Sequence, residues 1–481
     1  MISQQTRDLY TVTIGIECHV QLKTKTKLFA AVGNDAREAP VNTLVSHICF
    51  GMPGALPVLN AEAVRLATRA AFALGTEPER FSKFDRKHYF YPDLPKGYQI
   101  SQFDQPIIGK GEITILVDGQ PKTIGITRAH LEEDAGKSTH PTGKDYSLVD
   151  LNRAGTPLLE IVSEPDMHTA AEAKAYAHEL YLRMKYADVS EASLYYGNMR
   201  FDVNVSVSKT DELGTRTESK NLNSFRSVEK AVEYEVNRQI EQLEKGEKIV
   251  QETRGWDDAK QKTFSQRSKE NADDYRYMPD PDLPPIVITD EYVKNIGAEM
   301  PELPDDYRKK FAGMDIDTNT IEDIIANPQT AQLVAGIFEA SGAEHARRVA
   351  FWMMLNQEED EETTVDSDLK VSYENLTKLS QLVSDNKLSS TAAKEVLSDI
   401  LITNADPEVV ANEKNLLQVS DEGAIIAIVD QVLAANEKAA TDVKNGEMKA
   451  IGFLVGQVMK LSQGKANPAM AQELIKKQLG L

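Results

Sequence analysis

The chain has 481 residues, of which 54 are basic and 75 acidic, and its formal net charge is −21. A protein that coats nucleic acid needs clustered Lys and Arg to neutralise phosphates, so this balance argues against that class and is compatible only with a local basic patch. No apolar run reaches the length of a membrane span, the N-terminal segment has no targeting pattern, and two cysteines provide no disulfide framework. We therefore expect a cytoplasmic protein without membrane contact, with roughly three domains for its length.

Residues 10–22 alternate between apolar and polar side chains, which predicts a strand. Its polar face carries Glu17 and His19 side by side, pointing away from the core. A carboxylate and an imidazole on one strand face can contribute to a metal site, and a solvated outer face is the alternative interpretation. The apolar face consists of Val12, Ile14, Ile16, Cys18, Val20 and Leu22.

A helical pattern follows over residues 60–74, with Gly75 as its stop. The loop before it contains Cys49 without a second cysteine nearby, so we expect no structural zinc site. Further along, Asp118-Gly119 lies between two short alternating runs, which predicts a β-hairpin.

Residues 83–107 are dense in aromatic, charged and proline residues. The aromatic side chains either form a small local core or provide a wall for an adenine ring or a terminal nucleotide. In the second interpretation Tyr91 is the aromatic candidate, and Lys87 and Lys96 lie near phosphates.

Residues 125–166 concentrate charged side chains between short strand-like runs, which is typical of a polar site supported by strand ends. Solvated faces also contain such clusters. Gly136-Lys137-Ser138-Thr139 is similar to half of a P-loop, but the position that needs the first glycine is Leu131, so this segment would not hold ATP in that way. The charged set is His130, Glu132, Glu133, Asp134, Lys137, His140, Asp150, Arg153, Glu160 and Glu164.

Two further strands are predicted at 200–208 and 215–221, and the pair is expected to be joined through a loop with Gly214. Arg200 and Asp202 face outward on the first strand, and Arg216, Glu218 and Lys220 share one face of the second. A helix over 224–245 follows. The prolines at 301–304 mark a domain boundary, beyond which the pattern is helical, and the acidic run 358–368 is interpreted as a solvated connection.

The last forty residues, 442–481, hold six lysines and three acids, so this end is basic in an acidic chain. Residues 449–460 predict a helix in which Gly452 and Gly456 each cost up to about 1 kcal/mol relative to alanine. Either close helix packing or close approach to a nucleic-acid backbone would account for them. In the second case the neighbouring cations are Lys449, Lys460 and Lys465.

These motifs together resemble those of the GatB family, whose members are one of the subunits of the bacterial aspartyl/glutamyl-tRNA(Asn/Gln) amidotransferases. The resemblance implies an α+β fold, with a cradle-like mixed α/β catalytic domain and a largely antiparallel sheet over residues 1–300. An all-α helical domain over 301–410 and a small helical tail domain over 411–481, which binds tRNA, would follow. The matching stretches are residues 14–29, 53–60, 83–107, 125–140, 148–166, 219–235, 273–285 and 452–460.

The resemblance also implies a reaction. ATP phosphorylates the side-chain carboxylate of Glu or Asp misacylated on tRNA, and ammonia then displaces phosphate to give Gln-tRNA(Gln) or Asn-tRNA(Asn). The chain would thus be part of an ATP-dependent carbon–nitrogen ligase with glutamine as amido donor. Its partners in a heterotrimer would be an amidase (glutaminase) subunit, which supplies ammonia, and a small third subunit. Many relatives carry a zinc-binding cysteine cluster in the region of residues 29–50, where this chain keeps only Cys49.

The resemblance assigns Mg²⁺ ligands to Glu17, His19, Glu133 and Glu160, and a nearby basic role to Lys87. The chemistry is coherent, because a carboxylate is a poor electrophile until phosphorylation gives it a leaving group, and Mg²⁺ bridges the phosphates in that transfer. Lys87 would offset charge on the transferred phosphoryl group.

Two other functions fit parts of the sequence. One is a tRNA-binding scaffold subunit without catalysis, against which the presence of all four expected ligands argues. The other is a free-standing ATP-dependent ligase of a small acid, for which the basic helical tail would be superfluous. The sequence leaves open whether Asp-tRNA(Asn), Glu-tRNA(Gln) or both are substrates.

Overall fold

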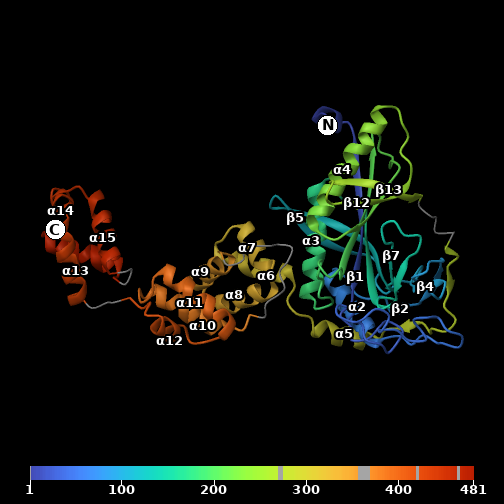
Figure 1. Ribbon diagram of the computed structural model, residues 1–481, viewed down its shortest axis with the longest axis horizontal. Coiled ribbons are helices and arrows are strands. Elements are labelled where there is room, and N and C mark those ends of the chain that lie inside the picture. Colours follow the sequence, from blue (N-terminus) through green and yellow to red (C-terminus); the bar gives the residue numbers. More distant parts are fainter. Residues whose placement is uncertain (1, 269–274, 356–368, 419–421, 463–465) are drawn as a thin grey trace. The chain divides into compact units, whose positions relative to one another are not determined.

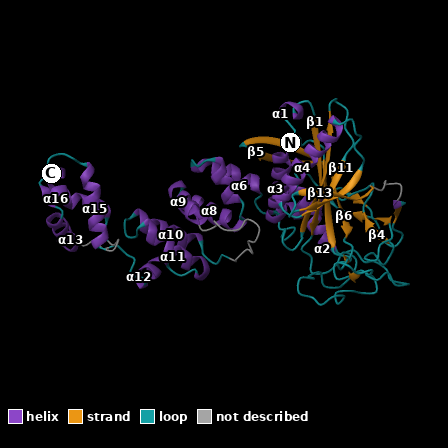
Figure 2. Cartoon of the chain, turned by 45° about the horizontal axis from the view of Figure 1, so that its top comes forward, coloured by secondary structure: helices purple, strands orange, loops and turns teal. Residues whose placement is uncertain are grey.

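The computed structural model describes residues 2–268, 275–355, 369–418, 422–462 and 466–481. The chain divides into two compact units, one up to Pro304 and one from Asp305 onward (Figure 1). The first is a mixed α/β unit and the second is helical, so the predicted fold class is confirmed (Figure 2). The finer division of the helical part near residue 411 stays a prediction. The acidic run 358–368 lies outside the described residues.

An eight-stranded sheet forms the first unit, in the order β13-β12-β11-β10-β1-β9-β6-β5. All its neighbouring strands pair antiparallel except β11 and β12, which pair parallel. The strands are β1 (Thr11–Gln21), β5 (Gly111–Val117), β6 (Gln120–Glu133), β9 (Pro157–Ser163), β10 (Met199–Ser208), β11 (Thr217–Leu222), β12 (Glu252–Asp257) and β13 (Lys262–Ser268).

The central strand β1 shows the predicted alternation. Its even-numbered residues from Val12 to Val20 are buried, and its odd-numbered residues are only partly covered. Helices α2 (Ala61–Ala73), α3 (Ala170–Tyr186) and α4 (Phe225–Glu244) contribute to the same apolar core, and Figure 1 shows α3 and α4 lying along the sheet. With one face packed on helices, the polar side chains of the strands are directed to the other face.

Local signals set the ends of these elements. Thr169 caps α3 in a capping box with Glu172, and Ser224 caps α4. The predicted hairpin joins β5 and β6 through Asp118 and Gly119, whose φ angles of 51° and 74° are those that a two-residue turn of this hand requires.

Three small sheets accompany the large one: β14-β3-β4, β15-β2 and β7-β8. Strand β4 packs beside β6, so the first small sheet lies next to the edge of the polar face. The bounds are β2 (Phe81–Ser82), β3 (Asp85–His88), β4 (Tyr98–Ser101), β7 (Lys137–Thr139), β8 (Leu148–Asp150), β14 (Met278–Pro279) and β15 (Ile286–Val287).

Helices make up the described part of the second unit, and α13 to α16 share an apolar core of their own. None of the helices in the described ranges is long and apolar enough to cross a membrane. The remaining elements are α1 (Gln4–Arg7), α5 (Asp290–Ala298), α6 (Pro304–Phe311), η2 (Ala312–Met314), α7 (Thr318–Ile325), α8 (Pro328–Ser341), α9 (Ala343–Leu355), α10 (Tyr373–Ser384), α11 (Ser390–Thr403), α12 (Pro407–Glu413), α13 (Glu422–Ala435), α14 (Glu437–Lys444), α15 (Lys449–Leu461) and α16 (Pro468–Leu479).

Candidate functional site

A row of charged side chains crosses four neighbouring strands on the polar face. In register, His130 of β6 is opposite Glu160 of β9, Glu160 is opposite His19 of β1, and His19 is opposite Arg200 of β10. Residues directly opposite each other in antiparallel strands have Cβ atoms about 4.5–5.5 Å apart. The sheet therefore brings together four residues that are far apart in the sequence.

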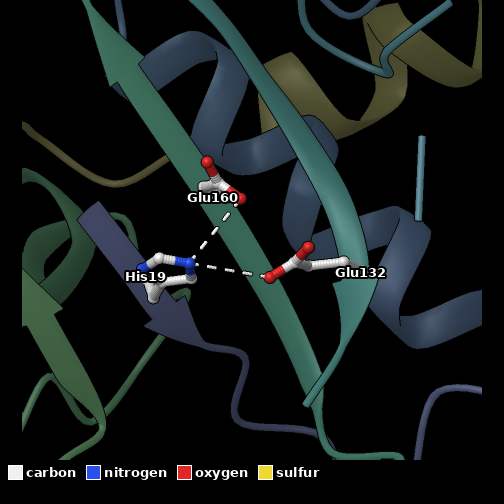
Figure 3. A group of neighbouring side chains, drawn as sticks. All are labelled: His19, Glu132 and Glu160. Atoms are coloured by element: carbon white, nitrogen blue, oxygen red, sulfur yellow. Dashed lines mark ion pairs between the residues drawn. The ribbon is translucent and has the colours of Figure 1, made fainter. Parts of the chain in front are cut away.

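The first carboxylate group of this face consists of His19, Glu132 and Glu160 (Figure 3). His19 Nε2 lies 3.6 Å from Glu160 Oε2 and 3.7 Å from Glu132 Oε1. Glu132 shares the face of His130 because it lies two residues further along β6. One imidazole and two carboxylates form a donor set that suits a divalent cation of the Mg²⁺ and Mn²⁺ type. The residues therefore fit the metal that the resemblance implies.

A second histidine contacts the same two carboxylates. His130 Nε2 lies 3.3 Å from Glu160 Oε2 and 3.7 Å from Glu132 Oε2. Burial alone would lower the pKa of His130, but the two facing carboxylates outweigh it and raise that pKa to about 9. Burial alone would raise the pKa of Glu160, yet His130, His19 and Lys87 bring it well below its ordinary value.

A second carboxylate group lies on the same face and consists of Glu17, Asp202 and Glu218. Register explains it, since Glu17 of β1 is opposite Asp202 of β10, and β11 pairs with β10. Lys220 Nζ donates to Asp202 Oδ2 at 2.9 Å and holds the pKa of this buried carboxyl below its usual value against the effect of burial. Glu17 also lines a cavity of about 230 Å³ along β1. Three carboxylates offer the oxygen ligands that Mg²⁺ prefers.

The structure places Glu133 apart from both groups. It forms an ion pair with Lys96, and its Oε1 accepts a hydrogen bond from the Ile100 backbone N–H at 2.9 Å. Consecutive residues of a strand face opposite sides, so β6 directs Glu132, and not its neighbour, toward His19. Glu132, Asp202 and Glu218 are not among the ligands expected from the sequence. For Glu132 the available signal is its spacing of two residues from His130.

Lys87, on β3, lies among aromatic rings. Its Nζ is 4.8 Å from the ring centre of Tyr275 and 6.0 Å from that of Tyr89. Burial would lower the pKa of Lys87, but nearby groups, Glu132 first among them, raise it. Tyr91, also from the predicted nucleotide wall, is half exposed and lies 5.9 Å from Tyr89 between ring centres. Aromatic rings therefore contact both one another and the lysine.

The predicted tail helix is present as α15. Its apolar stripe, with Ile451, Leu454 and Val458, is buried. An added Cβ at Gly452 or Gly456 would meet no atom within 4 Å, so close packing in the described part of the unit does not account for either glycine. Phe453, between them, is 52% exposed, and Lys449 and Lys460 are exposed as well. Lys465 lies outside the described residues.

The two cysteines are buried and free. Cys49 Sγ lies 3.6 Å from Lys27 Nζ. Burial raises the pKa of the Cys18 thiol well above its usual value, which is the opposite of what an activated nucleophile needs. The expected absence of structural zinc stays a prediction.

Comparison with known proteins places this face in context. A family model described as the GatB/GatE catalytic domain matches residues 12–294, and one described as the GatB domain matches residues 336–479. The curated B-type subunit of the aspartyl/glutamyl-tRNA(Asn/Gln) amidotransferase of Carboxydothermus hydrogenoformans is 45% identical over 489 residues, which cover 98% of this chain and 99% of the relative. Its counterpart in Desulfotalea psychrophila is 46% identical over 477 residues, with the same coverage. The chain belongs to this family.

The two matches coincide with the features described above. The catalytic-domain match spans all residues of both carboxylate groups, and the second match spans α15. The relatives' name describes them as one subunit of a multi-subunit, tRNA-dependent amidotransferase.

Proposed function

We propose that this chain is the activating and transamidating subunit of a tRNA-dependent amidotransferase. It phosphorylates the side-chain carboxylate of Glu or Asp misacylated on tRNA and then directs ammonia to the activated carbon. The observation that carries the proposal is the pair of carboxylate groups on one face of the sheet, within the part of the chain that matches the family's catalytic domain.

The first step joins a substrate carboxylate oxygen to the γ-phosphorus of ATP and releases ADP. In the second, ammonia attacks the acyl carbon and phosphate leaves, so the products are the amide and inorganic phosphate. His19, Glu132 and Glu160 on one side, and Glu17, Asp202 and Glu218 on the other, are the residues that would hold Mg²⁺. When bound, Mg²⁺ neutralises phosphate charge during the transfer.

Lys87 supplies a cation beside the first carboxylate group. A fixed positive charge in a partly dry site stabilises negative charge on the transferred phosphoryl oxygens without having to reorganise. Its aromatic neighbours, Tyr89 and Tyr275, restrict the ammonium position. Tyr91 and Lys96 remain the proposed nucleotide contacts from the same segment. Glu133 contributes to this nucleotide site by holding Lys96 in an ion pair.

The exposed face of α15 is the proposed tRNA contact. Two glycines without side chains permit close approach of a phosphate backbone, and Lys449 and Lys460 supply charge on the same helix. Lys465 belongs to the same proposal by its place in the sequence. The substrate is Glu-tRNA(Gln), Asp-tRNA(Asn) or both, which places the protein in the cytoplasm with the translation machinery.

Ammonia comes from a partner. Cys18 is buried with a raised thiol pKa, so it does not suit glutamine hydrolysis. We propose that an amidase (glutaminase) partner is the source and that a small third subunit completes a heterotrimer, which is the assembly that the resemblance implies.

The test uses the reconstituted complex with misacylated Glu-tRNA, Mg²⁺ and γ-labelled ATP, without an ammonia donor. Wild type should form labelled phosphoryl-Glu-tRNA and release ADP, and His19→Ala should lose both. His345→Ala, in the helical unit, is the matched control and should behave as wild type. Normal label transfer by His19→Ala would mean that the first carboxylate group is not the activation site.

A further inference from the structure

We propose that His130 is a positioning residue for the cation site, which holds the carboxylates of Glu132 and Glu160 through its Nε2 atom so that they face His19. The inference deepens the proposed function and rests on its cation site. His130 would not bind the cation itself; it would act through the two carboxylates.

The two histidines contact different oxygens of Glu132 and the same oxygen of Glu160. His130 Nε2 approaches Glu132 Oε2, at 3.7 Å, whereas His19 Nε2 approaches Glu132 Oε1, also at 3.7 Å. Each imidazole thus faces its own oxygen of Glu132. Both face Oε2 of Glu160, at 3.3 Å for His130 and 3.6 Å for His19.

Exposure distinguishes the roles of the two rings. The side chain of His19 is 19% exposed, which leaves a route for an ion, whereas that of His130 is 5% exposed. His130 therefore lies behind the carboxylates and His19 at the accessible side. Carboxylates that bind metals are commonly held by such outer partners, and their removal typically costs 10–100-fold in metal affinity.

The other ring nitrogen indicates that His130 is kept for this contact. Nδ1 of His130 is buried and has no hydrogen-bond partner among the described residues. A buried polar atom without a partner costs about 1–3 kcal/mol. A residue needed only to fill this position could avoid that cost with an apolar side chain. The contact of Nε2 with the carboxylates is what remains to offset the cost.

The pair of carboxylates explains why such a residue is needed. Glu132 and Glu160 repel each other when both are ionised, so without a donor between them they would turn apart before a cation arrives. His130 Nε2 lies 3.3 Å from Glu160 and 3.7 Å from Glu132, so an N–H there attracts both carboxylates, and the site is then formed in advance of binding. The contact requires only an N–H at Nε2, which the neutral ring can also carry.

Two substitutions separate the contribution of Nε2 from that of the ring's bulk. The amide nitrogen of Gln reaches about as far as Nε2, and that of Asn about as far as Nδ1. His130→Gln should therefore keep a donor to the carboxylates, and His130→Asn should lose it, although both are polar and uncharged. His19→Ala is the reference for loss of a ligand.

The measurement is the dissociation constant of Mn²⁺ by electron paramagnetic resonance, on the purified heterotrimer without ATP or tRNA, with thermal unfolding of each variant. We expect His130→Gln to bind within about threefold of wild type and His130→Asn to bind about 10–100-fold more weakly. The Mn²⁺ concentration for half-maximal activity should shift in the same order.

Each other result has a distinct meaning. Equal Mn²⁺ binding by wild type and His130→Asn, with weaker binding by His19→Ala, would overturn the role of His130 and leave the proposed cation site intact. Equal loss in the Gln and Asn variants, with equally lowered unfolding temperatures, would show a packing role and also overturn it. If wild type does not bind Mn²⁺, or if His19→Ala binds as wild type does, the cation site of the proposed function fails and this inference with it.

Discussion

The two units of this protein differ in where their charged side chains lie: buried and paired in the first, and exposed on α15 in the second. In the first, buried carboxylates are matched with partners: the register of the sheet brings Glu132 and Glu160 to histidines, and Glu235 of α4 pairs with Arg238 and Arg254. In the second, Lys449 and Lys460 of α15 stay exposed beside open glycines. Buried charges act strongly over short distances, which suits a small, highly charged reacting group. Each exposed charge attracts a phosphate only weakly, but several of them together bind a long polyanion.

Glu160→Gln would test the buried side of this comparison most directly. It keeps the volume and removes the charge that His19, His130 and Lys87 share. Since a bound cation supplies several kcal/mol of transition-state stabilisation, we expect formation of phosphoryl-Glu-tRNA to fall about 1000-fold. Rapid-quench measurement of labelled product checks this, with tRNA affinity as the control that should not change.

Glu235→Gln would test whether buried charge also stabilises the fold away from the site. Glu235 is fully buried, and its carboxylate lies 2.7 Å from Arg238 and 3.0 Å from Arg254. Removing one partner leaves charge buried and unpaired, so we expect unfolding to become easier by about 3 kcal/mol at pH 7, measured by urea denaturation.

The same variant gives a pH dependence. Burial would raise the pKa of Glu235, but Arg238, Thr263 and Arg254 lower it below its ordinary value of 4.5. A lowered pKa contributes stability above the unfolded value, and that stability is lost as the pH falls through the folded value. The difference in stability between wild type and Glu235→Gln should thus be constant above about pH 5.5 and shrink below about pH 4.5. A difference that grows on acidification would contradict the assignment.

Lys87→Met should produce a smaller kinetic effect than Glu160→Gln. The unbranched side chain of Met is one atom shorter than that of Lys, keeps most of the packing against the aromatic rings and loses the charge. We expect about a 100-fold lower rate of phosphoryl transfer, the size of one oriented donor at a developing negative charge, with little change in the unfolding temperature. Loss of folding in place of loss of rate would indicate a structural role for the lysine.

The sequence predicts local features of the site well and its assembly less well. Alternation in β1 indicated the face of Glu17 and His19, alternation in β10 placed Asp202 outward, and alternation in β11 placed Glu218 on one face with Lys220. It could not show that these strands flank one another, because the order β11-β10-β1-β9 depends on contacts far apart in the sequence.

The sequence pattern also did not single out Glu132, for a different reason, and the assignment of Glu133 as a ligand, which comes from the resemblance, stays a prediction. The run from His130 to Asp134 is almost entirely polar, so it has no apolar alternation to indicate the buried face. A register shift between Ile126 and Arg128 further separates this end of β6 from the pattern of its first half. Only the pairing with β9 decides which glutamate meets His19.

The smallest effect is expected on the exposed side of the comparison, from Gly452→Ala with Gly456→Ala. Both glycines lie in a helix with open space around them, so alanine should stabilise the helix by about 0.5–1 kcal/mol at each position. If the same surface receives a tRNA backbone, two added methyl groups should weaken binding by about 1 kcal/mol, roughly fivefold in KM for Glu-tRNA with kcat unchanged. Gln472→Ala, exposed on α16, is the matched control. A variant that is both more stable and unchanged in KM would leave the two glycines without a role in tRNA binding, and the exposed charge of this unit would then need another partner.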